Sequence, residues 1–149
     1  MELKLNVREY LPGDFNAINQ LWKDTIMGGS MRGDNEETID RTIKAGGKLF
    51  VLENPVSREI IGTSWLSHDQ RRIYIHHFGI KPAFQGKGYA HFLMKASMDF
   101  AQSTGMQIKL EVHKDNFKAV QLYKKWGFNY LGDYDVYIIR DYKLIQQSG

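Results

Sequence analysis

The stretch Gln85-Gly86-Lys87-Gly88-Tyr89-Ala90 (QGKGYA) lies between an apolar segment that ends at Ile80 and a long pattern of apolar residues at helical spacing. Glycines allow a tight turn, and the amides just before a helix point outward as unpaired hydrogen-bond donors. The helix end adds about half a positive charge, and Lys87 adds a point charge. The stretch therefore predicts an anion site of the kind that most often holds phosphate.

Two common phosphate loops do not fit this stretch. A Walker A loop requires Ser or Thr after its lysine, whereas Lys87 is followed by Gly88. The dinucleotide pattern GxGxxG begins well at Gly86, but His91 occupies the place of its last glycine. A plain glycine turn between a strand and a helix is the alternative interpretation.

The segments around the turn alternate between strand and helix patterns. We expect strands over residues 60–66, 72–80 and 108–112, and helices from about 88 to 104 and from about 115 to 126. Residues 128–144 read as two more apolar, Tyr-rich strands around Gly132-Asp133. A strand, a helix and another strand in succession imply at least one parallel pair.

The first half of the chain adds two strands and two helices. Residues 3–8 and 49–52 have strand patterns, and the three strands over 49–80 predict an antiparallel meander. Asp14 is a candidate N-cap for a first helix, which should end at Gly28-Gly29, and Asp34 with Glu37 has capping-box spacing for a second. The expected fold is α/β, with a mixed, mainly antiparallel twisted sheet and helices on both faces.

Length and composition set the broad class of the protein. The 149 residues favour a single domain over 1–149, and the absence of cysteine excludes a disulfide framework and suits a reducing cytoplasm. No signal peptide or apolar run of membrane-spanning length is present, so no membrane association is expected. The net charge of +3 suits a polyanionic ligand and is too small to indicate nucleic-acid binding.

Two motifs together resemble the GNAT superfamily of N-acetyltransferases. Gln85-x-x-Gly88-x-Ala90 is similar to that family's [QR]-x-x-G-x-[GA] signature. The segment Asn116-x-x-Ala119-x-x-Leu122-Tyr123-x-x-x-Gly127-Phe128 is similar to its N-x-x-A-x-x-L-Y-x-x-x-G-F segment. The motifs stand in the family's order and cover residues 71–131. The resemblance implies the acyl-CoA N-acyltransferase fold and an N-acetyltransferase with acetyl-CoA as co-substrate and no metal.

The resemblance also implies roles for the residues that bind the cofactor. The pyrophosphate would sit on the amides of the turn, and the pantetheine arm would pair with the strand edge at Phe78-Gly79-Ile80, where an amide near Phe78 could polarise the thioester. Asn116 could cap its helix, contact CoA, or both. The cofactor-binding residues are then Phe78, Ile80, Gln85, Gly86, Lys87, Gly88, Tyr89, Ala90, Asn116 and Tyr123.

The catalytic candidates are Tyr123, His77 and Glu111. The resemblance implies that Tyr123 protonates the departing thiolate, although it could instead donate a hydrogen bond to the sulfur or be a core aromatic. A base should accept the amine proton, and His76, His77 and Glu111 are the candidates. His76 and His77 are adjacent on a strand, so we expect them to face opposite sides. A metal site from His76, His77 and His113 has no support from ligand spacing.

The acceptor is expected to be a primary amine on a small molecule or peptide. The loop 27–34 and the strands near Tyr134 and Tyr137 would border its pocket. The Tyr-rich terminal strands could also pair across a homodimer. One alternative is a non-catalytic acyl-CoA sensor or interaction module of the same fold. Another is a nucleic-acid or partner-binding module that uses a lysine cluster at positions 114, 118, 124 and 125.

Overall fold

Five strands form one sheet in the order β1-β2-β3-β4-β5 in the computed structural model, which describes residues 4–25 and 33–145. β1 to β4 pair antiparallel in succession, and β4 pairs parallel with β5. The predicted meander and the predicted parallel pair are therefore both confirmed. The strands are β1 (Asn6–Glu9), β2 (Lys48–Glu53), β3 (Ile60–His68), β4 (Arg72–Ile80) and β5 (Gln107–Leu110).

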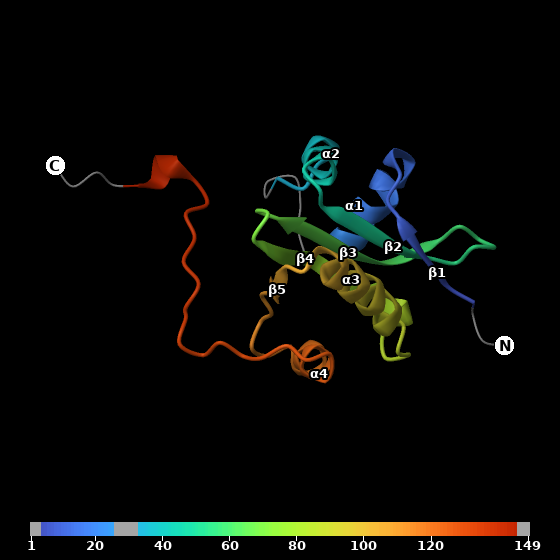
Figure 1. The fold of residues 1–149 in the computed structure, drawn as a ribbon. Coiled ribbons are helices and arrows are strands. Elements are labelled where there is room, and N and C mark those ends of the chain that lie inside the picture. The colour runs from blue at the N-terminus through green and yellow to red at the C-terminus, as the bar shows by residue number, and fades with distance from the viewer. Residues whose placement is uncertain (1–3, 26–32, 146–149) are drawn as a thin grey trace.

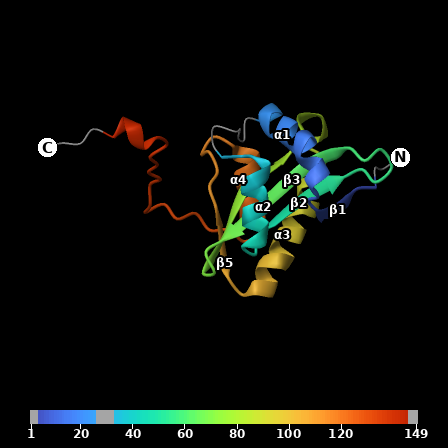
Figure 2. The same cartoon turned by 90° about the horizontal axis from the view of Figure 1, so that it is seen from above.

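Helices cover both faces of the sheet, as the sequence predicts (Figure 1). One face carries α1 (Phe15–Asp24) over β3 and α2 (Glu36–Lys44) over β2. The other face carries α3 (Ala90–Thr104), which crosses the sheet from β1 to β4, and α4 (Phe117–Lys125) (Figure 2). Among the residues that the structure describes, none of the helices is both long and apolar enough to cross a membrane.

The core divides into a layer on each side of the sheet. On the α1/α2 side, Trp22 of α1 stacks on Trp65 of β3 with ring centroids 5.5 Å apart. On the α3/α4 side, Ile73 and Ile75 of β4 pack with Met94 of α3 and Tyr123 of α4. Burial of these large side chains stabilises each layer by roughly 1.5–3 kcal/mol per residue.

Asp14 stands at the N-cap position of α1, as predicted, whereas the predicted cap of α2 is wrong. The Asp14 carboxylate makes no cap hydrogen bond to α1, because it accepts instead from the Arg8 guanidinium at 2.8 and 2.9 Å and from the Leu11 amide. At α2 the cap is Asn35, whose side chain accepts from the Thr38 amide at 2.8 Å. Asp34 is therefore not the cap of α2, and its side chain is buried. The predicted stop of the first helix at Gly28-Gly29 lies outside the described residues.

The two strands predicted over residues 128–144 do not form. The described chain from 129 to 145 is extended, apart from the short 3-10 helix η4 (Tyr142–Leu144), and it runs away from the body of the molecule (Figure 1). A strand needs a neighbour for its backbone groups, and this segment has none within the described chain. The apolar pattern that suggests strands is nevertheless real, and the side chains concerned are exposed.

Candidate active site

β4 and β5 separate partway along the length of β4. Their parallel pairing joins residues 72–75 to residues 107–110 and stops there, while β4 continues to Ile80. Within the described residues, the last five residues of β4 therefore have an open edge on the β5 side. An open strand edge can pair with an extended, amide-containing ligand as it would with another strand.

A β-bulge lies at the start of this open edge. On the β3 side, Trp65 pairs with His76 and Thr63 pairs with Gly79, so Ser64 faces two residues of β4, His77 and Phe78. His77 has a φ of 43°, in the left-handed region that few residues other than glycine adopt. The Thr63 hydroxyl donates to the His77 carbonyl at 2.7 Å and accepts from the Trp22 indole at 3.0 Å, which fixes the bulge.

The bulge places both histidines on the α1/α2 side, contrary to the prediction that they face opposite sides. The centroid of the Trp65 ring is 5.9 Å from that of His76 and 5.5 Å from that of His77. Strict alternation along a strand holds only while the pleat is regular, and a left-handed residue in a bulge interrupts it. Phe78 then lies on the other side, where its ring contacts Tyr123.

The His77 ring is held in an aromatic pocket beside a buried carboxylate. It lies 4.6 Å from the Trp22 ring, and its Nε2 atom is 2.9 Å from Oδ1 of Asp34 without meeting the geometry of a hydrogen bond. Asp34 is only 5% exposed. The structure therefore places the Asp34 carboxylate next to His77, the candidate base. The capping-box spacing in the sequence predicted this carboxylate at the start of α2 instead.

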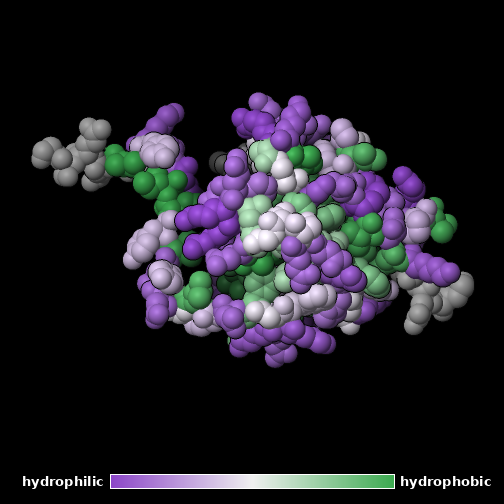
Figure 3. Space-filling view, in the orientation of Figure 1, coloured by the Kyte–Doolittle hydropathy of each residue, from purple (hydrophilic) through white to green (hydrophobic). Residues whose placement is uncertain are grey.

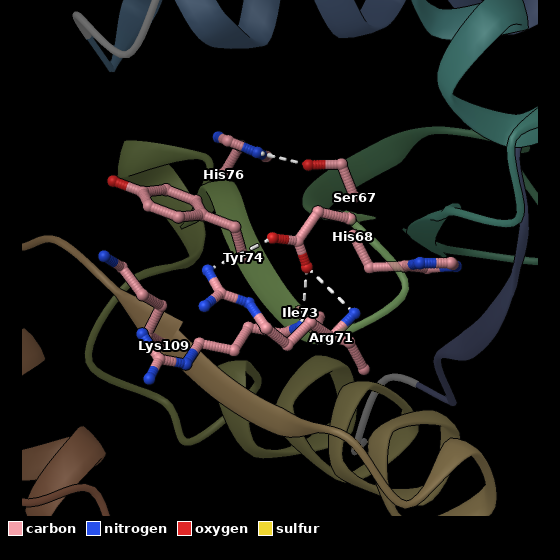
Figure 4. Close-up of a pocket in the computed structure, with 9 residues that line it drawn as sticks. Ser67, His68, Arg71, Ile73, Tyr74, His76 and Lys109 are labelled. Carbon is pink, nitrogen blue, oxygen red and sulfur yellow. Dashed lines mark hydrogen bonds and ion pairs between the residues drawn. The ribbon is translucent and has the colours of Figure 1, made fainter.

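His76 has a different environment from His77. Its Nε2 atom is 2.7 Å from the Ser67 hydroxyl, and its ring stacks on Tyr74 at 4.4 Å (Figure 4). Burial and, to a smaller extent, the neighbouring His77 lower the pKa of His76 to about 4. His76 is therefore neutral at physiological pH.

Glu111, the other candidate base, follows β5 directly and is exposed. Burial raises the pKa of Tyr74, and the nearby Glu111 carboxylate contributes to that rise. Tyr74 and His76 line a cavity of about 370 Å³ on this side of the sheet, together with Lys109 and the turn after β3 (Figure 4). The Lys109 ammonium lies 5.5 Å from the centre of the Tyr74 ring. Glu111 thus lies in the group of side chains around Tyr74 and His76.

The turn before α3 presents a row of unused donors. Gly86 and Gly88 have φ of 77° and 81°, and a side chain would meet no atom within 4 Å at either position. Within the described residues, the amides from Gly86 to Ala90 have no hydrogen-bond acceptor in the protein. The Gln85 amide differs, because it donates to the Pro82 carbonyl at 3.3 Å, while the Gln85 side chain donates to the Ile80 carbonyl at 2.9 Å.

Tyr123 lies on the opposite side of β4 from the histidines. It is 8% exposed, and its ring contacts the edges of Phe78 and Phe128 at 5.9 and 5.8 Å. Burial raises the pKa of Tyr123 to about 12, so its hydroxyl keeps its proton at neutral pH. Asn116 caps α4 by accepting from the Ala119 amide at 3.3 Å, which confirms the capping role that the sequence offered.

Most of the loop expected to border the acceptor, residues 27–32, lies outside the described residues. Its last two residues, Gly33 and Asp34, are described, and Asp34 reaches His77. The segment around Tyr134 and Tyr137, where the sequence predicted strands at the acceptor pocket, extends away from the body of the molecule (Figure 1). Nothing in the sequence indicates a role for Trp65, Thr63 or Ser67. These residues belong to no motif, and only the pairing of β3 with β4 brings them to the histidines.

A family model described as "Acetyltransferase (GNAT) family" matches residues 15–128. The chain therefore belongs to the GNAT acetyltransferase family, and the five-stranded mixed sheet with helices on both faces is that family's fold.

Solved structures of low sequence identity share this fold. An acetyltransferase from Streptococcus agalactiae is 18% identical over 91% of each chain, with a TM-score of 0.74. A glucosamine-6-phosphate N-acetyltransferase from Arabidopsis thaliana is 16% identical over 93% of this chain and 99% of that one, with a TM-score of 0.74. A GNAT acetyltransferase from Elizabethkingia anophelis with acetyl-CoA bound is 19% identical over 86% and 78%, with a TM-score of 0.61.

Proposed function

We propose that this chain is an N-acetyltransferase that transfers the acetyl group of acetyl-CoA to a primary amine by direct attack in a ternary complex. The observation that carries the proposal is the row of unused amides from Gly86 to Ala90 at the start of α3, together with the open edge of β4 that precedes it in the chain. Amides and a helix N-terminus suit a diphosphate, and the open edge suits the amide-rich pantetheine arm. Lys87 and the side chain of Asn116 would each assist cofactor binding.

The thioester would lie at the bulge, between the two sides of β4. A bulge leaves the extra residue outside the regular ladder, so a backbone amide near Phe78 is available to donate to the thioester oxygen. The amine nitrogen attacks the carbonyl carbon, the carbon–sulfur bond breaks, and CoA leaves as a thiolate. Ile80 and Phe78 would border the arm, because the pantetheine would follow the same edge.

Tyr123 would act on the departing sulfur. A thiol has a pKa of about 8.5, so full proton transfer from a tyrosine whose pKa is about 12 is uphill by about 5 kcal/mol. Its burial therefore favours a hydrogen bond from the hydroxyl to the thiolate, with the final proton supplied by solvent.

His77 would accept the proton that the amine loses. A lysine-like amine has a pKa of about 10.4, so its deprotonation at neutral pH costs about 4–5 kcal/mol without a base. Nε2 of His77 is buried beside Asp34, so Nδ1 would be the atom that receives the proton from the amine. The Asp34 carboxylate beside Nε2 would stabilise the imidazolium that this transfer produces. Glu111 would act as base only through water, because it lies beyond Tyr74.

The test is a panel of amines assayed by release of free CoA thiol, with acetyl-CoA binding measured separately by calorimetry. The proposal expects thiol release above hydrolysis with at least one amine class, and a mass increase of one acetyl group on that amine. Binding of acetyl-CoA with no transfer to any amine in a broad panel would instead favour the non-catalytic sensor of the same fold. The cytoplasmic location and the lack of a metal requirement remain predictions.

A further inference from the structure

The cavity beside Tyr74 has no role in the chemistry described so far. Its walls come from β3, β4, β5 and the turn between β3 and β4, and within the described residues neither α1 nor α2 contributes to them. Hydrophilic side chains gather at this end of the sheet, around that turn (Figure 3). A volume of about 370 Å³ is enough for a small polar ligand, so we call this space the Tyr74 cavity and consider what it could bind.

Strand register brings polar side chains from three strands together in the Tyr74 cavity. Tyr74 of β4 pairs with Ser67 of β3 on one side and with Lys109 of β5 on the other. Arg72 and His76 lie on the same side of β4 as Tyr74, because alternate residues of a strand share a face. The cavity is therefore built on paired strands, which hold its side chains more precisely than a loop would.

Two cations at the outer end of the cavity, next to the turn, have no counter-ion. Asp69 is the one carboxylate that lines the cavity in the described chain. It accepts from the amides of Arg71 and Arg72 at 2.9 and 2.8 Å, and it lies 3.4 Å from the Arg71 guanidinium. The side chains of Arg72 and Lys109 have no carboxylate within ion-pair distance in the part of the chain that the structure describes. An oxyanion between them would receive charge-assisted hydrogen bonds.

The inner end of the cavity, at His76, has the opposite charge. Burial lowers the pKa of His76, and the nearby carboxylates of Asp34 and Glu111 act in the other direction by a smaller amount. Asp34 also lies 2.9 Å from Nε2 of His77. Figure 4 shows His76 at one end of the cavity, with Lys109 and Arg71 towards the other. The charge therefore changes sign along the cavity, from negative near the proposed base to positive near the turn.

The spacing along β4 sets the length of a ligand that uses both ends. A strand rises about 3.3 Å per residue, so the Tyr74 position lies about 10 Å from the His77 position and the Arg72 position about 16 Å from it. The long side chains of Lys109 and Arg72 can both reach an anion near the shorter of these distances. An amine and an acid that share one carbon atom are too close together to meet both ends of the cavity.

We propose that the amine acceptor carries an oxyanion, a phosphate or a carboxylate, about 10 Å from its amine, and that Arg72 and Lys109 bind this oxyanion in the Tyr74 cavity. The inference rests on the proposed acetyl transfer, which places the amine at His77. It adds a substrate class to that function: an elongated amine with an acid at its far end. A polyamine is disfavoured, because it would place a second cation beside Arg72.

The first experiment measures binding by calorimetry with CoA present, so that no acetyl transfer occurs. The probes are four amines on the same eight-carbon chain, which spans about 10 Å: aminooctyl phosphate, aminooctanoate, aminooctanol and diaminooctane. At least one of the two acids should bind about 10- to 100-fold more tightly than the alcohol, and the diamine should bind most weakly. The order of the two acids distinguishes phosphate from carboxylate. Equal affinity for the acids and the alcohol would overturn the proposal.

The second experiment assigns the preference to named side chains. The variant Arg72→Gln/Lys109→Gln should lower the affinity ratio of acid to alcohol by about 10-fold or more, and in the thiol-release assay the effect should appear in KM for the acid. The matched control Arg41→Gln/Lys44→Gln removes two exposed cations of α2 and should keep the ratio. Circular dichroism of each variant checks that it is folded.

The two readouts separate this inference from the proposed function. A preference for the acid that survives in Arg72→Gln/Lys109→Gln would overturn the assignment of the oxyanion to the Tyr74 cavity, whether or not any amine is acetylated. Acid binding that depends on Arg72 and Lys109, without transfer to any amine, would support the anion site and count against the acetyl transfer alone.

Discussion

The two sides of β4 differ in how their functional groups are built. On the α3/α4 side, the turn before α3 provides backbone amides, and Tyr123 reaches Phe78 from a helix that Asn116 caps. On the α1/α2 side, His77 is held by Trp22, Trp65 and Asp34, which come from two helix regions and another strand. The first side depends on local chain geometry and the second on long-range packing.

This difference suggests a division of labour along one strand. The α3/α4 side carries donors that suit a diphosphate and a thiolate, whereas the α1/α2 side carries groups that suit a proton leaving an amine. His77 and Phe78 join the two, because these neighbours in the chain have their side chains on opposite sides of the sheet. Variants on each side should therefore affect different kinetic quantities.

The largest effect is expected from His77→Asn. Asparagine tolerates the left-handed conformation of this residue but cannot act as a base near neutral pH, so kcat/KM for the amine should fall by about 10²–10³-fold. The dissociation constant of acetyl-CoA should be unchanged. Steady-state kinetics and calorimetry provide the two measurements, and His113→Asn, at an exposed histidine, is the control. A loss of acetyl-CoA affinity as large as the loss in kcat/KM would contradict the division of labour between the two sides of β4.

Acidification should destabilise the protein through His76. The folded pKa of His76 is about 4, below its ordinary value of 6.5, so the unfolded chain binds this proton more readily. The free energy of unfolding should thus hold above pH 6.5 and decline as the pH falls to about 4, by up to about 3 kcal/mol. Urea unfolding at each pH measures this free energy of unfolding.

The variant His76→Gln should remove most of that decline, because glutamine does not titrate. His113→Gln should retain it, since that side chain is exposed. A decline that persists unchanged in His76→Gln would mean that other groups govern stability in this range.

Gly88→Val should weaken acetyl-CoA binding by about 30-fold, because a β-branched residue is strained at a φ of 81° and would reorient the donors of the turn. Gly105→Val is a closely matched control: Gly105 has a φ of 73°, open space around it, and a position at the other end of α3. Calorimetry that finds equal affinity in the two variants would argue against the turn as the pyrophosphate site.

The smallest effect is expected from Tyr123→Phe. The ring contacts with Phe78 and Phe128 remain while the donor to the sulfur is lost, so kcat should fall by about 10-fold with little change in acetyl-CoA affinity. Tyr10→Phe, on the far side of the sheet from Tyr123, should leave kcat unchanged. Unaltered turnover in Tyr123→Phe would remove this hydroxyl from the mechanism.

The sequence predicts the local structure on the α3/α4 side well. Gly86 and Gly88 can adopt the left-handed conformation that the turn before α3 needs, and Asn116 caps α4 as its position suggests. The strands of the meander and the parallel β4–β5 pair also follow from periodicity and element order. These features depend on residues close together in the chain, where backbone conformation and hydrogen bonding are local.

The sequence predicts the α1/α2 side poorly, for reasons of register and packing. Alternation along a strand assigned His76 and His77 to opposite sides, and the bulge opposite Ser64 reverses that assignment. Capping-box spacing assigned Asp34 to the start of α2, but Asn35 caps that helix and leaves Asp34 beside His77. Neither outcome can be read from spacing, because each depends on a partner about 10 to 45 residues away.

The amino-acid sequence alone determined the family, the turn of free amides and the apolar pattern of residues 129–145, since each is written in consecutive residues. Only the tertiary structure decided which histidine meets Asp34, which side of β4 each aromatic ring occupies, and that residues 129–145 extend away from the sheet. These depend on strand register and on contacts between distant segments, which only the packed molecule brings together.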